Sequence, residues 1–255
     1  MMRRGLLVIG CVGVLGVVGC SSQSSGTPQA VSTSPPGAAV STSTTTASAT
    51  PSPSGPRLDQ VGGEAYAPLA LTVQDVPAGY TALKGTAEQA EEQAQSGVQN
   101  STVTPPGCGT VSPISPNSAK GGLLAAFGKA ATQEAIAEFL APAAAVSLPD
   151  LKATALRCAS LSLSAPQKGV QLTGRIEVID VPHVAADQTL GLRTTTITTV
   201  AGSPPVTVVQ TNYIAETKAT LVSLNAKGGP SGAPLDPATS AAAFTTAVQK
   251  ANANR

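Results

Sequence analysis

No side chain between Arg4 and Arg57 is ionisable, apart from those of two cysteines. From Ser21 to Pro56 the chain is rich in Ser, Thr, Pro and Ala and has no periodic apolar face. Such a segment buries too little apolar surface to offset the entropy that ordering would cost, so we expect a disordered tether. Folding is thereby confined to residues 57–255, which suffice for one globular domain with a single core.

The first twenty residues resemble a bacterial lipoprotein signal peptide. Two arginines precede an uncharged, mostly apolar stretch at 5–19, which is shorter than the roughly 20 residues of a membrane-spanning helix. The stretch runs into Val-Val-Gly-Cys at 17–20, which matches the lipobox pattern. The resemblance implies that residues 1–19 are a signal peptide, that cleavage falls between Gly19 and Cys20, and that the Cys20 thiol receives a diacylglycerol. The protein would then be anchored to the extracytoplasmic face of the cell membrane.

Other interpretations of this segment stay open. A second short match at 8–11 would place Cys11 at the lipidation position, but only about six apolar residues would precede it. The paired arginines partly resemble a twin-arginine export signal, and the segment also permits an uncleaved N-terminal anchor. Residues 20–56 would form the lipidated cysteine and its tether, which spans roughly 30–36 Å as a flexible coil. This segment is interpreted as a spacer, although its composition also suits O-glycosylation.

Charge and composition exclude several kinds of site. The chain has one histidine, six aromatic residues and no tryptophan. Removing Arg3 and Arg4 from its 15 basic residues leaves 13, against 14 acidic ones. A near-neutral chain with few aromatics argues against nucleic-acid binding, and a single histidine argues against a multi-histidine zinc site. We therefore expect no nucleic acid, no metal and no cofactor.

Two helices are indicated by their caps and by their apolar spacing. Asp236 and Pro237 predict the N-cap and first residue of a C-terminal helix. Its apolar face would carry Ala241, Phe244, Thr245 and Val248. A second helix is predicted from about 149 to 160, with Ser147 or Asp150 as the first-turn acceptor. Its apolar face would carry Leu151, Ala155 and Cys158. Residues 86–96 indicate a short polar helix, and 132–140 fit either a helix or a strand.

Strands are indicated in the second half of the chain. Residues 169–181 alternate between apolar and polar side chains, and 192–200 are rich in β-branched residues followed by the hairpin sequence AGSPP. Shorter segments at 161–164, 206–215 and 218–224 continue the pattern. Consecutive short strands with tight connections predict an antiparallel meander. The expected fold class is α+β, with the helices packed on one face of an antiparallel sheet.

Cysteine usage predicts one disulfide. Cys11 would leave with the signal peptide, and Cys20 would carry the lipid. Cys108 and Cys158 are then two thiols in an exported domain, where oxidation is expected. We predict a bridge between Cys108 and Cys158, with two inert buried thiols as the alternative. No C-x-x-C spacing supports a redox pair.

No group of residues in the sequence indicates catalysis. His183 lies between Asp180 and Asp187, in a segment interpreted as a strand-to-helix connection, and no G-x-S-x-G elbow accompanies it. Glu134 and Glu138 would share one helix face, which is interpreted as solvated rather than as a cation site. We therefore predict that the protein is not an enzyme.

Four motifs resemble those of actinobacterial, especially mycobacterial, cell-envelope lipoproteins of uncharacterised function. They are DVPAGY at 75–80, PPGC at 105–108, LPDLKATALRC at 148–158, and PLD at 234–236. In layout these lipoproteins are similar to the extracellular sensor domain of a mycobacterial Ser/Thr kinase. The resemblance implies a disulfide-tied antiparallel sheet with helices and a cleft, and it implies no catalytic residues. Kinase sensor domains usually carry two bridges, whereas the expected folded domain of this chain has cysteines for only one.

The function we expect is that of a membrane-anchored, non-catalytic lipoprotein whose domain binds a ligand or acts as a sensor. Its partners would be the plasma membrane and either a small envelope ligand or an envelope protein. The ligand-binding residues are not identified by the sequence. A lipid or glycolipid carrier is the alternative and requires a large apolar cavity. An envelope hydrolase that uses His183 is a third hypothesis.

Overall fold

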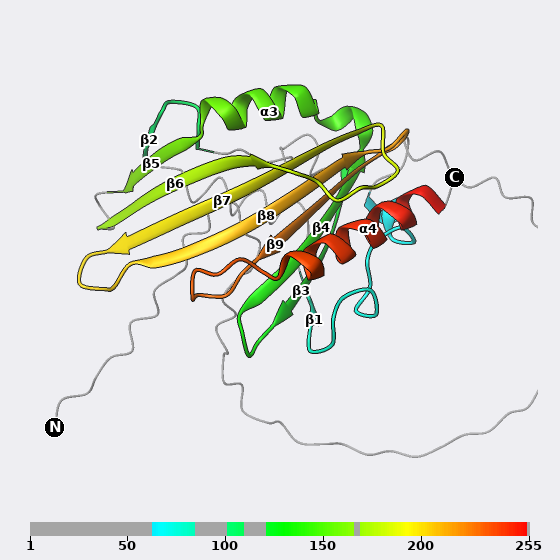
Figure 1. The fold of residues 1–255 in the computed structure, drawn as a ribbon, viewed down its shortest axis with the longest axis horizontal. Coiled ribbons are helices and arrows are strands. Elements are labelled where there is room, and N and C mark those ends of the chain that lie inside the picture. Colours follow the sequence, from blue (N-terminus) through cyan, green and yellow to red (C-terminus); the bar gives the residue numbers. More distant parts are fainter. Residues whose placement is uncertain (1–62, 85–100, 110–120, 166–168, 254–255) are drawn as a thin grey trace, which may run out of the picture.

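The computed structural model describes residues 63–84, 101–109, 121–165 and 169–253. In these ranges the chain forms one nine-stranded sheet with two α-helices and two short 3-10 helices (Figure 1). The signal peptide, the tether and the polar helix expected at 86–96 lie outside the described residues.

All neighbouring strands of the sheet are antiparallel, in the order β1-β3-β4-β9-β8-β7-β6-β5-β2. The strands are β1 (Thr81–Leu83), β2 (Thr102–Thr104), β3 (Leu123–Lys129), β4 (Glu134–Pro142), β5 (Ser160–Ala165), β6 (Val170–Ile179), β7 (Gln188–Val200), β8 (Val206–Glu216) and β9 (Thr220–Lys227). The helices are η1 (Gly63–Tyr66), η2 (Ala143–Ala145), α3 (Leu148–Arg157) and α4 (Pro237–Ala253). An antiparallel sheet with helices confirms the expected α+β class.

The predicted meander is confirmed, because β5 to β9 lie side by side in chain order. Burial alternates along β6 as expected: Val170, Leu172 and Ile176 are buried, whereas Arg175 is exposed. The AGSPP sequence joins β7 to β8 in a long hairpin, which projects to the left in Figure 1. Gly202 makes this turn possible, because its φ of 80° lies where residues with a side chain are strained.

The segment at 132–140, which fitted either a helix or a strand, forms most of β4. This strand lies between β3 and β9, and nearly every one of its side chains is buried. A strand covered on both faces has apolar residues at successive positions, so alternation is hidden in its sequence. Gln133 closes the β3–β4 hairpin with a φ of 56°, and its amide donates to the carbonyl of Lys129 at 2.8 Å.

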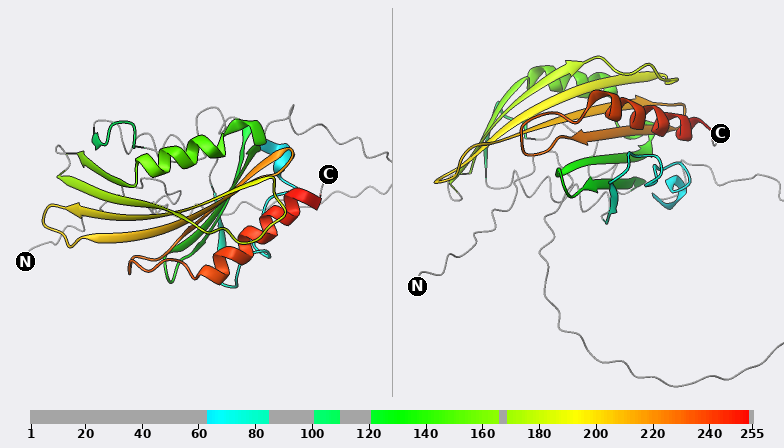
Figure 2. Two further views of the ribbon diagram at one scale, coloured as in Figure 1. Left: turned by 45° about the horizontal axis from the view of Figure 1, so that its top comes forward. Right: turned by 60° about the horizontal axis from the view of Figure 1, so that its bottom comes forward.

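The two helices pack on opposite faces of the sheet, so the prediction that they share one face is wrong. The cluster under α4 contains Ile136 and Leu140 of β4, whereas the cluster under α3 contains Phe139 and Ala141 of the same strand. Successive residues of a strand point to opposite faces, and β8 and β9 divide their side chains in the same way. Two views of the twisted sheet show the helices over different regions of it (Figure 2). The central strands therefore need cover on both sides.

Both predicted helix caps are confirmed. The Asp236 carboxylate accepts hydrogen bonds from the amide and hydroxyl of Thr239 at 2.9 and 2.8 Å, and Pro237 is the first residue of α4. Ser147 Oγ accepts from the amide of Asp150 at 3.4 Å at the start of α3. The buried face of α4 comprises Ser240, Ala243, Phe244, Ala247, Val248 and Ala251.

Phe244 anchors α4, since it is fully buried and its ring centroid lies 5.4 Å from that of Tyr213 in β8. We expect Phe244→Ala to lower the free energy of unfolding by about 3–5 kcal/mol, because truncation leaves a cavity that the sheet cannot close. Urea denaturation measures this change. Leu156→Ala on α3 is the control, since Leu156 is 59% exposed and should change stability by less than about 0.5 kcal/mol. Equal effects of the two substitutions would contradict the burial of Phe244 between α4 and the sheet.

Candidate functional site

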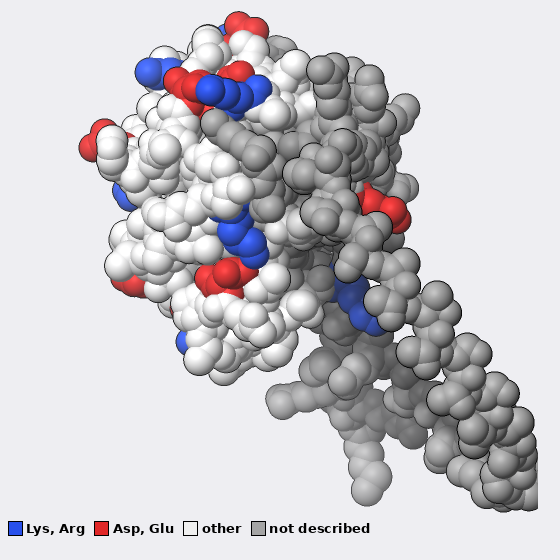
Figure 3. Space-filling view, turned by 90° about the vertical axis from the view of Figure 1, so that its right-hand side faces the viewer, with Lys and Arg blue, Asp and Glu red and all other residues white. Residues whose placement is uncertain are grey.

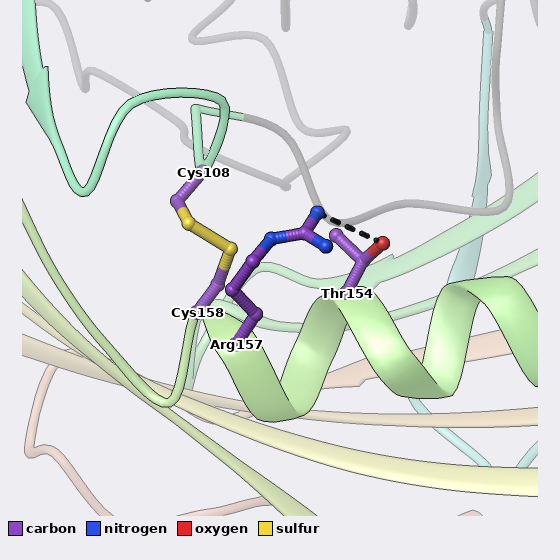
Figure 4. Close-up of a disulfide and its surroundings, with 4 residues drawn as sticks. All are labelled: Cys108, Thr154, Arg157 and Cys158. Carbon is purple, nitrogen blue, oxygen red and sulfur yellow. Dashed lines mark hydrogen bonds between the residues drawn. A yellow bond between two sulfur atoms is a disulfide. The ribbon is translucent and has the colours of Figure 1, made fainter.

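The structure joins two of the predicted site residues. Cys108 and Cys158 form the expected disulfide, with an S–S distance of 1.95 Å and a Cα–Cα distance of 5.6 Å (Figure 4). Both residues are buried, and the bridge ties the loop after β2 to the end of α3. On the last turn of α3, Arg157 Nη2 donates to Thr154 Oγ1 at 3.3 Å. Gly19 and Cys20, the predicted cleavage and lipidation residues, lie outside the described part of the chain.

His183 is exposed in the segment that joins β6 to β7. The expected strand-to-helix connection is therefore wrong, because the meander continues with another strand at this point. Asp180 and Asp187, on either side of His183 in the sequence, are exposed as well.

Glu138 lies in a different environment from the one its sequence position predicts. A solvated helix face was expected for it, but it lies on a central strand and is 0% exposed. Its side chain is on the α4 face, between β3 and β9, where Ala125 and Leu224 are its register partners. Glu138 Oε2 accepts a hydrogen bond of 2.6 Å from the amide of Leu71, whereas Oε1 has no hydrogen-bond partner among the described residues.

The segment Gly63–Leu83 covers this carboxyl group, and we call it the strap. It contains η1 and β1, and β1 is an edge strand that pairs with β3. The strap crosses the α4 face of the sheet and contributes apolar side chains to the core. Its buried residues are Tyr66, Leu69, Ala70, Leu71, Val76 and Tyr80.

An ion pair connects the strap to α4 near Glu138. Lys250 Nζ lies 2.8 Å from Asp75 Oδ2, which also accepts hydrogen bonds from the amide and hydroxyl of Thr72, both at 2.7 Å. Burial acts to raise the pKa of Asp75, but the hydrogen bonds from Lys250 and Thr72 outweigh it and lower the pKa below its usual value. Asp75 is therefore ionised at neutral pH and completes the pair with Lys250.

Burial raises the pKa of Glu138 from its usual value near 4.5 to about 7. The amide of Leu71 and the positive charge of Lys250 oppose this shift, while the negative charge of Asp75 adds to it. Desolvation prevails because the side chain has no access to water and the cation is already paired with Asp75. Glu138 is thus a carboxyl group that changes its charge near neutral pH.

A second carboxylate of β4 holds the far end of the strap. Tyr80 Oη donates to Glu134 Oε2 at 3.2 Å, and Lys129 Nζ lies 3.9 Å from the same oxygen and 6.0 Å from the centroid of the Tyr80 ring. Burial first, and then the charge and hydrogen bond of Glu134, raise the pKa of Tyr80 above its usual range. Glu134 is partly exposed, unlike Glu138, although both side chains lie on one face of the strand.

The α4 side of strands β5 to β7 is a polar surface, which we call the hydroxyl face. Its exposed or half-exposed residues include Ser160, Ser162, Gln171, Thr173, Arg175, Glu177, Arg193, Thr195, Ile197 and Thr199. The guanidinium of Arg175 pairs with Glu177 at 3.0 Å. Serine and threonine side chains outnumber charged ones among these residues. Of the described helices, α3 lies on the opposite face of these strands and α4 packs on β8 and β9.

A hollow of about 470 Å³ opens between the β6–β7 connection and the end of α4. Its described lining residues are Ala185, Ala186, Asp187 and Asn252. Asn252 Nδ2 donates to the carbonyl of Ala185 at 2.8 Å, which ties the end of α4 to the connection.

Charges on the surface are sparse and mixed. Figure 3 shows basic and acidic side chains in small mixed groups on one side of the molecule, with uncharged surface between the groups. Within the described residues, no three His, Cys, Asp or Glu side chains are grouped so that they could hold a metal ion. In the same ranges, no helix has the length and hydropathy that a membrane crossing requires.

The chain belongs to the DUF5642 family, described as a domain of unknown function. The family model matches residues 60–251, a range that includes the strap, the whole sheet and α4 up to its last turn. No curated protein matches the sequence.

Removing the disulfide should destabilise the domain. We expect the double substitution Cys108→Ala with Cys158→Ala to lower the free energy of unfolding by about 2–5 kcal/mol, because the bridge closes a loop between residues 50 apart in the sequence. Chemical denaturation measures the loss. The single substitution Cys108→Ala should cost about as much as the pair, since either change opens the same loop. A double variant as stable as the wild type would contradict a structural role for the bridge.

Proposed function

We propose that this member of the DUF5642 family is an extracytoplasmic lipoprotein whose domain binds a ligand without catalysing a reaction. In this proposal residues 1–19 are removed, Cys20 carries the lipid, and residues 21–56 connect the lipid to the domain. The observation that carries the proposal is the Cys108–Cys158 disulfide, since such bridges persist in oxidising compartments outside the cytoplasm.

The distribution of the four cysteines supports this localisation. The two in the domain are paired with each other, and the other two lie in the first twenty residues. A cysteine at position 20 directly after an apolar stretch is the arrangement that a lipid-transfer reaction requires. The lipobox and the disulfide are separate features of the chain, and both favour export.

The interior of the domain favours a binding protein over the alternative of a lipid carrier. The space between α4 and the sheet is filled by fully buried side chains, among them Ile136, Leu140, Val222, Leu224 and Phe244. These side chains occupy the position between helix and sheet where a carrier would hold its lipid. A hydrolase would have to use His183 from an exposed loop.

The hydroxyl face is the surface that best suits a ligand. It offers hydroxyl and carboxamide groups on a rigid sheet, and its charges are few and partly paired. Groups of this kind form hydrogen bonds with a neutral polar molecule. We infer that the ligand is a small, uncharged, hydroxyl-rich or amide-rich component of the cell envelope.

The anchoring part of the proposal predicts the behaviour of two cysteine variants. Cys20→Ser should abolish incorporation of a labelled fatty acid and move the protein from the membrane fraction to the soluble fraction, because serine offers no thiol for the thioether. Cys11→Ser is the matched control and should keep both the label and the membrane association. Metabolic labelling followed by fractionation measures both properties. Label that persists in Cys20→Ser and is lost in Cys11→Ser would reverse the assignment.

The binding part predicts a small molecule that copurifies with the protein from its own host. Native mass spectrometry should detect it, and Thr173→Val with Thr195→Val should lower its occupancy about tenfold, because two hydroxyls are lost while side-chain volume is kept. Thr246→Val on α4 is the control and should leave the occupancy unchanged. A bound protein in place of a small molecule, or equal occupancy in all variants, would contradict the proposed ligand.

A further inference from the structure

The strap is held to the sheet at its centre by one buried carboxyl group. The amide of Leu71 donates to Glu138 Oε2, and the contact joins residues 67 apart in the sequence. Around it, Leu69, Leu71 and Val76 pack in the same core as β4. The position of the strap over β4 therefore depends on a group whose charge is not fixed.

The ionised form of Glu138 is poorly accommodated in this position. A carboxylate that is 0% exposed needs partners for both oxygens, but Oε1 has none among the described residues. A proton on Oε1 removes the charge and leaves Oε2 able to accept from Leu71. Contact of the carboxyl group with water would remove this penalty on the charged form.

The groups that face Glu138 do not remove this penalty. The strap contributes Asp75, whose negative charge opposes ionisation, and η1 contributes the buried Tyr66. α4 contributes Lys250, which favours ionisation but is paired with Asp75 at 2.8 Å. The strands on either side contribute no titratable group at this level, since the register partners are Ala125 and Leu224.

Along β4 itself, the nearest titratable group on the same face is Glu134. It is bonded to Tyr80 and lies near Lys129, and it is partly exposed to water. Because it has its own partners and lies partly in water, Glu134 is a suitable control for Glu138.

We propose that Glu138 is a proton-controlled latch: its protonated form holds the strap Gly63–Leu83 on the sheet, and its ionised form loosens the strap. The latch is a property of the domain and does not depend on the lipid anchor or on the ligand of the proposed function. Loosening would uncover apolar side chains of the sheet, among them Phe127, Ile136 and Leu140. In the sequence the strap begins seven residues after the predicted tether ends at Pro56, so in the lipoprotein proposed above its release would also change how the domain is connected to the membrane.

The direction of the effect follows from proton linkage. The pKa of Glu138 is about 7 with the strap in place and falls toward its usual value near 4.5 when the strap is open. The closed form thus binds more protons than the open form between these two values. The stabilisation of the closed strap is complete below the lower value and is lost as the pH rises through about 7.

Hydrogen–deuterium exchange of the full-length protein tests the latch. We compare protection of the strap amides at about pH 5.5 and about pH 8, after division by the intrinsic exchange rate at each pH. Wild-type protection at residues 69–76 should fall by about tenfold or more between the two conditions. Glu138→Gln keeps an acceptor for Leu71 and cannot ionise, so its protection should be independent of pH. Glu134→Gln should retain the wild-type fall.

Two results would overturn the proposal: equal wild-type protection at the two pH values, or a loss of protection of wild-type size in Glu138→Gln.

Lys250→Met gives a further check. Removing the cation should move the midpoint of the pH-dependent loss of protection to higher pH, whereas Lys129→Met should not. Carbon-13 NMR of the wild-type carboxyl groups covers the case in which a variant fails to fold. If the titration midpoint of the Glu138 carboxyl group lies at the usual value near 4.5, that result alone refutes the latch.

Discussion

The central strands of the sheet bury side chains on both faces, and the arrangement of the other elements follows from this requirement. Tyr213 and Ile214 are neighbours in β8, yet one packs under α4 and the other belongs to the α3 cluster. A single helical layer would have left one of these sets in water, at a cost of about 1.5–3 kcal/mol for each large side chain. α4 and the strap therefore share one face, while α3 and the disulfide loop occupy the other.

Local patterns were sufficient to predict the elements but not the side on which each one packs. The caps at Ser147 and Asp236 act over three residues, so they can be recognised in the sequence alone. The alternation in β6 is visible because one of its faces is exposed. In β4 both faces are buried, and Thr132–Leu140 consequently fitted a helix as well as a strand. An apolar helix face shows that a helix packs, but not against which face of a sheet.

The two sites differ in how far the sequence could predict them. The bridge could be predicted because only Cys108 and Cys158 lie in the folded domain, so a count of cysteines determined the pair. The burial of Glu138 depends on a strap that meets β4 from far away in the sequence. Its one local signal is its position within the apolar run AIAEFLA, where a solvated glutamate is unexpected. Spacing from Glu134 suggested a shared helix face, but on a strand the same spacing places both residues on one face with different exposure.

The two faces of the sheet are stabilised by different interactions, and this difference determines where the domain can respond to its surroundings. On the α3 face, a covalent bond fixes the end of the helix to the loop after β2, and its strength does not vary with pH. On the α4 face, the strap is held by hydrophobic contacts and by three polar contacts. The polar contacts are those of Glu138, Glu134 and the Asp75–Lys250 pair, and each involves an ionisable group. Under the proposed latch, a change of proton concentration acts on the strap and leaves the disulfide bridge unchanged. The proposed latch would thus loosen the strap while the disulfide-bonded half of the sheet keeps its structure.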